Sequence, residues 1–86
     1  MREFIDADPS YIRWRDTHPD SFVLNCNRHP HPAYLKLHRA ICPWLRWSGR
    51  LTHSYIKICA SDPSELEAWA RTHTGGTLQP CGHCHP

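Results

Sequence analysis

The feature that most constrains how this chain can fold is the pair of thiols in Cys81-Gly82-His83-Cys84. Two cysteines at this spacing can hold one metal ion, form a redox-active disulfide or attach a haem. A chain of 86 residues buries only a small core, and domains of this size often need a metal or disulfides for stability. The chemistry of these two thiols therefore bears on the whole fold.

Redox and haem chemistry both fit the rest of the sequence poorly. Disulfide isomerases use the same tetrapeptide, but with the first thiol at a helix N-terminus, and only two residues follow Cys84. Haem attachment through Cys81-x-x-Cys84-His85 is associated with export. The first eight residues lack the apolar segment of a signal peptide, and Met1 is the only methionine. We therefore predict no haem; a disordered tail with idle cysteines is the remaining alternative to a metal.

The cysteine content also favours a metal over disulfides. Without an export signal we predict a cytoplasmic protein, in which thiols stay reduced. Five cysteines are an odd number, which argues against a closed set of disulfides. No run approaches the roughly 20 apolar residues of a membrane span, so we expect no membrane partner. The sequence therefore predicts Zn²⁺ as the cofactor, with Cys81 and Cys84 as the firmest ligands.

A tetrahedral zinc site needs two further ligands, and the sequence offers three candidates. His38 and Cys42 are separated by three residues, a usual ligand spacing, and Cys59 is the alternative to Cys42. If a hairpin is centred on Ser48-Gly49, His38 lies opposite Cys59 on the same face. His38 and Cys42 would then be about 13 Å apart along an ideal strand, unless the strand breaks before Pro43. We favour His38 and Cys42, with Cys59 left open.

Helix signals flank a stretch of strand signals, which predicts a single α+β domain over residues 1–86. Asp8-Pro9 and Asp62-Pro63 each place an N-cap aspartate before a proline in the first helical position. His18-Pro19 ends the first helix and Gly75-Gly76 the second. We predict the order α-β-β-β-α, in which two helices flank a small three-stranded antiparallel sheet that is followed by a C-terminal zinc knuckle.

The three strands are predicted over residues 21–25, 34–42 and 53–59. The last alternates cleanly, with Ile56 and Ile58 on one face. The middle segment fits both strand and helix periodicity, and we favour a strand that breaks near Cys42. A helix there would place His38 and Cys42 on one face without any break.

Four stretches of the sequence together resemble a group of small, poorly characterised bacterial domains. The resemblance covers roughly residues 8–86 and implies a zinc-binding domain, sometimes found beside restriction-type nuclease modules, with a link to DNA recognition or defence. It includes both Cys42 and Cys59, so it leaves the fourth ligand open. The stretches are Phe22-Val23-Leu24-Asn25, Tyr34-Leu35-x-Leu37-His38-Arg39-Ala40-x-Cys42, Tyr55-Ile56-Lys57-x-Cys59 and Cys81-Gly82-x-Cys84.

Charge and aromatic content suggest binding rather than catalysis. Four protein ligands leave no open position on the zinc, and no spacing pairs a nucleophile with a base, so we predict no enzyme. The net charge is +2, but eight of the ten basic residues are Arg, which suits phosphate. We predict a nucleic-acid-binding module, and alternatively a protein-interaction module with Trp44 and Trp47 as anchors. The expected nucleic-acid contacts are Lys36, Arg39, Trp44, Arg46, Trp47, Arg50, Tyr55 and Lys57.

Overall fold

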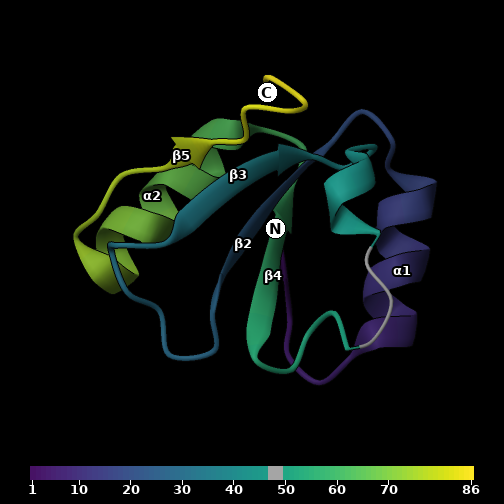
Figure 1. Cartoon of the computed structure of the whole chain (residues 1–86), viewed down its shortest axis with the longest axis horizontal. Helices are drawn as coiled ribbons and strands as arrows, with labels where there is room; N and C mark the ends of the chain where they lie inside the picture. Colours follow the sequence, from purple (N-terminus) through teal and green to yellow (C-terminus); the bar gives the residue numbers. More distant parts are fainter. Residues whose placement is uncertain (47–49) are drawn as a thin grey trace.

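The apolar runs of the chain assemble into one mixed β-sheet, which the computed structural model describes over residues 1–46 and 50–86 (Figure 1). Helices α1 and α2 and the short 3-10 helix η1 pack around it. The elements are β1 (Arg2–Phe4), α1 (Asp8–Thr17), β2 (Phe22–Asn27), β3 (Leu35–Arg39), η1 (Pro43–Leu45), β4 (Tyr55–Ala60), α2 (Pro63–Thr74) and β5 (Gln79–Pro80).

The sheet has the strand order β1-β4-β2-β3-β5. β5 runs parallel to β3, and the other neighbouring strands are antiparallel. The predicted α+β class is therefore confirmed, but a sheet of three antiparallel strands is wrong. The two edge strands, of three and two residues, are too short to show a strand period in the sequence.

β2 lies between β3 and β4, so the predicted hairpin between the latter two does not form. Val23 is paired with His38 on one side and with Cys59 on the other. The predicted turn centre, Ser48-Gly49, lies outside the described residues. β2 takes the central position because it is apolar on both faces, with Val23 on one face and Leu24 on the other.

The two faces of the sheet carry separate hydrophobic clusters. On one face, α2 packs on the sheet through Leu66, Trp69 and Ala70. On the other face, α1 contributes Tyr11 and η1 contributes Leu45. Three of the five cysteines belong to the second cluster as buried members: Cys42, Cys59 and Cys81. Figure 1 shows α2 and α1 on opposite sides of the sheet, with the C-terminal tail above the end of β3.

The capping signals predict one helix start correctly and one incorrectly. In α2, Asp62 accepts a hydrogen bond from the Ser64 N–H at 2.9 Å, and Gly75 ends the helix with φ 73°, as predicted. In α1, the N-cap is Ala7 instead of Asp8. The Asp8 carboxylate accepts hydrogen bonds from the backbone N–H of Leu51 at 2.9 Å and of Thr52 at 2.8 Å. It therefore anchors the chain just before β4.

Gly76 sits where the chain leaves α2, and a side chain does not fit there. A Cβ at this position would lie 2.7 Å from Pro32 Cβ and 2.9 Å from Leu35 Cδ1. We expect Gly76→Ala to lower the free energy of unfolding by about 1–3 kcal/mol because the rigid Pro32 ring must move. Gly82→Ala is the control, since a Cβ there meets no atom within 4 Å. Thermal unfolding of both variants measures the difference, and equal losses would contradict this account.

Candidate metal centre

The middle strand ends early, and this break creates half of the site. β3 stops at Arg39, and the Cys42 N–H donates to the Arg39 carbonyl at 2.9 Å in the turn that follows. Pro43 then begins η1. The predicted break near Cys42 is confirmed, and it brings Cys42 back towards the end of β3 and His38.

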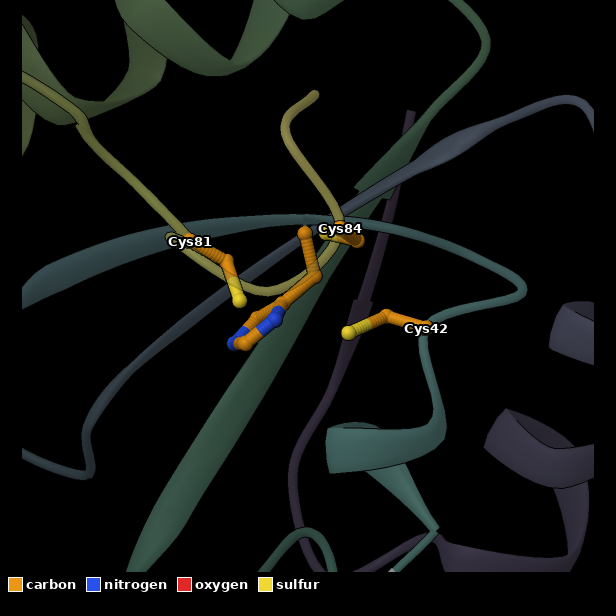
Figure 2. Close-up of side chains that lie close together, drawn as sticks. Cys42, Cys81 and Cys84 are labelled. Carbon is orange, nitrogen blue, oxygen red and sulfur yellow. The ribbon is translucent and has the colours of Figure 1, made fainter.

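The C-terminal segment supplies the other half because β5 runs beside β3. The Cys81 N–H donates to the Leu37 carbonyl at 2.8 Å, which extends the β3–β5 pairing to the first cysteine. The chain then turns, and the His85 N–H donates to the Cys81 carbonyl at 3.1 Å. In Figure 2 the side chains of Cys42 and Cys81 reach towards one centre from opposite sides.

Four side chains meet at this point: His38, Cys42, Cys81 and Cys84. One donor atom from each lies within 4.8 Å of all the others. In a tetrahedral site with metal–sulfur bonds near 2.3 Å, sulfur atoms lie about 3.8 Å apart, so a small contraction suffices to bind an ion. Three of the residues are buried and Cys84 is half-buried. Three sulfurs and one imidazole nitrogen form a donor set typical of closed structural sites.

Backbone N–H groups donate hydrogen bonds to two of the sulfur atoms. The Arg39 N–H lies 3.3 Å from Cys84 Sγ, and the His83 N–H lies 3.4 Å from Cys81 Sγ. Such donors stabilise thiolate sulfur and orient it towards a metal. The Arg39 guanidinium also donates to the carbonyls of Cys84 and His85, both at 3.2 Å. Arg39 therefore fastens the tail over the end of β3.

The electrostatics of His38, Cys42 and Cys81 are compatible with a bound cation. Burial, with Lys57 and Lys36 nearby, lowers the pKa of His38 to about 4, so its imidazole is neutral at pH 7. Its Nδ1 is buried and has no hydrogen-bond partner among the described residues. Burial raises the pKa of Cys42 to about 12, whereas the pKa of Cys81 is lowered, against its burial, by hydrogen bonds from the backbone N–H groups of Cys84 and His83. A metal ion is what allows several adjacent thiols to ionise together.

Cys59 lies apart from these four side chains. Because Val23 of β2 stands between His38 and Cys59, the two are separated by two strand spacings, about 10 Å. Cys59 is completely buried, and burial raises its pKa to about 12. The structure thus brings together His38, Cys42, Cys81 and Cys84 and leaves Cys59 in the hydrophobic cluster.

Acidification is expected to release a metal bound here. The folded pKa of His38 lies below its ordinary value of 6.5, so the unfolded chain takes up a proton first as the pH falls. Stability is therefore lost downward from about pH 6.5, and protons also compete for the thiolates. A chromogenic metal indicator, read together with circular dichroism between pH 7.5 and 4, follows both events. Full retention of the metal at pH 4 would contradict this assignment.

The residues predicted to contact nucleic acid have diverse positions. Arg46 pairs with Asp16 at 3.4 Å, Arg39 holds the tail, and Trp47 lies outside the described residues. The other five line two cavities of about 340 and 480 Å³, beside the metal centre and on the sheet face opposite α2. These five are Lys36, Trp44, Arg50, Tyr55 and Lys57.

The two cavities adjoin, and we call them together the groove. They share Tyr34, His38 and Trp44. The sequence analysis did not single out Tyr34, Asn25 or His83 as lining residues. Asn25 and Lys36 lie opposite each other in the β2–β3 pairing, so strand alternation would place them on one face once that pairing is known.

Within residues 1–46 and 50–86, no helix is long and apolar enough to cross a membrane. Comparison of the sequence with models of protein families and with curated proteins, and of the structure with solved structures, found no significant match. The fold and the chemistry of the four clustered side chains therefore carry the functional argument.

Proposed function

We propose that this chain is a small zinc-binding module that recognises nucleic acid through the groove beside the metal centre. One observation carries the proposal: among the described residues, the groove is lined by cations and aromatic rings and by no carboxylate. Cations hold phosphates, and aromatic rings stack on exposed bases. The ligands of the zinc would be His38, Cys42, Cys81 and Cys84, and with all four positions filled we propose no catalytic role.

The zinc would also shape the groove. Trp44 follows the ligand Cys42 by two residues, and His83 lies between the ligands Cys81 and Cys84. The Trp44 and His83 rings are 5.6 Å apart, so they pack together across the two halves of the metal centre. Binding of the ion would therefore fix the rim of the groove as well as the fold.

The remaining lining suits a single strand. The Tyr34 and Tyr55 rings are 5.6 Å apart and tilted, and Tyr55 and Trp44 are both exposed, so unpaired bases can stack on the aromatic surface of the groove. Lys36 and Arg50 flank these rings in the two cavities and can reach phosphates. The resemblance to domains that occur beside restriction-type nuclease modules favours DNA in a defence or restriction context.

The test is fluorescence anisotropy at low salt with single-stranded, duplex and modified DNA. We expect salt-sensitive binding, with a smaller salt dependence in Lys36→Ala/Arg50→Ala because each lost phosphate contact lowers the slope by about one. Arg13→Ala/Arg71→Ala removes the same charge from exposed positions that do not line the groove, and serves as the matched control. No binding to any DNA, or equal losses in both double variants, would reject the proposal.

A protein partner is the second candidate, favoured by exposed apolar side chains around Cys42. Ile41 is 58% exposed and Trp44 is 54% exposed. Exposed Trp is a frequent anchor in protein interfaces, and Trp47, outside the described residues, was predicted as a second one. Ile41→Ser separates the two candidates because Ile41 does not line the groove. If DNA binding stays intact while capture of a defined partner is lost, the interaction role is supported.

A further inference from the structure

The smaller cavity of the groove, about 340 Å³, has a buried cation in its wall. Lys57 is only 5% exposed, and its Nζ donates to Asn25 Oδ1 at 2.7 Å and to the Leu51 carbonyl at 2.6 Å. An ammonium group has three N–H donors, so one has no hydrogen-bond acceptor among the described residues, although the ammonium also lies 5.8 Å from the centroid of the Tyr11 ring. No described carboxylate lies within ion-pair distance of Lys57, although the charge of Asp8 acts on it electrostatically. Such a buried ammonium is costly unless acceptors satisfy it.

The other polar groups in this wall also offer donors. The Asn25 side chain uses its oxygen to accept from Lys57, and its Nδ2 donates to the Tyr34 hydroxyl at 3.2 Å. Because the Tyr34 hydroxyl accepts there, its own proton is available to the cavity. Arg50 carries only donors. A ligand that fills this cavity must therefore present acceptors.

The remaining walls favour a flat ligand. Tyr34 and Tyr55 meet at a tilt of 59° on one side, and Leu45 and Leu51 add apolar surface. An aromatic ring can stack against such walls, whereas a lone tetrahedral anion leaves them unused. The volume of this cavity lies in the range of small-molecule sites and is large enough for a purine.

We infer that this cavity takes one unstacked base of a bound strand and prefers guanine to adenine. Guanine presents two adjacent acceptors, O6 and N7, and contact of Lys with these atoms is a common specific interaction. Adenine replaces O6 with an amino group, which would place a donor against the Lys57 ammonium. The inference deepens the proposed function and rests on it, since it names the base that the groove reads.

The experiment compares oligonucleotides that carry one purine in an otherwise all-thymine strand. For the wild-type protein we expect about tenfold tighter binding with guanine than with adenine, the discrimination typical of one good pair of base contacts. Inosine retains both acceptors and should bind like guanine, whereas 7-deazaguanine lacks N7 and should bind more weakly. These comparisons need no variant, so they do not depend on whether a mutated protein folds.

Two variants then place the preference at Lys57. Lys57→Met should remove the difference between guanine and adenine, and Lys36→Met, at the neighbouring cavity, should weaken both strands equally. Metal content and thermal unfolding show whether each variant is folded.

Equal binding of guanine and adenine strands by the wild type would overturn the inference and leave the proposed function standing. Displacement of the guanine strand by millimolar inorganic phosphate, dependent on Lys57, would also overturn it, because the cavity would then be an anion site. Failure of every strand to bind would reject the proposed function itself.

Discussion

Removal of the proposed zinc ion is expected to abolish the cooperative unfolding transition of this domain. The end of β3, η1 and the tail meet through His38, Cys42, Cys81 and Cys84, and two of these cysteines are buried in the cluster beneath α1. Structural zinc contributes an apparent binding free energy of about 10–16 kcal/mol in small peptides, which is comparable to the total stability of about 5–15 kcal/mol of a typical domain. Without it, the face of the sheet towards α1 should lose its order.

Circular dichroism during a thermal scan measures this effect in the presence of a strong zinc chelator and a reductant. We expect the transition to broaden and disappear, and to return when zinc is added in excess of the chelator. The control is the same chelator already saturated with zinc. An unchanged midpoint after complete removal of the metal would show that the sheet and α2 support the fold alone.

The second large effect is a difference between two buried cysteines. We expect Cys42→Ala to lose most metal affinity and to lower the midpoint of thermal unfolding by more than about 10 °C, since a domain of this size shifts by about 4–8 °C per kcal/mol. Cys59→Ala removes the same atoms from a fully buried position but should retain one metal per chain. Its cost is the smaller one of a lost buried sulfur atom.

The two variants form a matched pair because Cys42 and Cys59 belong to the same hydrophobic cluster. Metal binding is measured by competition with a chromogenic indicator, and stability is measured in parallel on the same samples. If Cys59→Ala lost the metal while Cys42→Ala kept it, the ligand set would have to be redrawn around β4.

Local signals in the sequence correctly predicted helix ends and strand breaks that one short segment determines by itself. Asp62, Pro63 and Gly75 specify the ends of α2 through hydrogen bonds and backbone angles that their neighbours supply. The break before Pro43 is likewise local. The prediction of Asp8 as an N-cap failed because a side chain that can cap a helix can also accept hydrogen bonds from backbone N–H groups elsewhere. In this fold the N–H groups of Leu51 and Thr52 lie within its reach.

Features that depend on strand order could not be derived from local patterns. The alternation in residues 53–59 identifies a strand, but it does not reveal that β2 separates this strand from β3. The position of β2 between these two strands is what separates Cys59 from His38. Lys57 was predicted to contact nucleic acid, but the alternation could not show that it is buried in the cavity wall, where its ammonium donates to the carbonyl of Leu51 in the segment held by Asp8.

The spacing of the cysteines was the most reliable guide to the site. Cys81 and Cys84 are close in the chain, and the three residues between His38 and Cys42 required only a turn to bring both donors together. No pattern in the sequence predicts the parallel pairing of β5 with β3, which places the tail at the end of β3. Two residues of edge strand leave no periodic signal.

The most direct test of the central claim is the metal content of protein purified under reducing conditions without added metal. Inductively coupled plasma mass spectrometry, with native mass spectrometry for the stoichiometry, gives the identity and number of bound ions. We predict one zinc per chain. A well-folded protein that contains no zinc, or that keeps its metal when Cys81 and Cys84 are both replaced by alanine, would contradict the account.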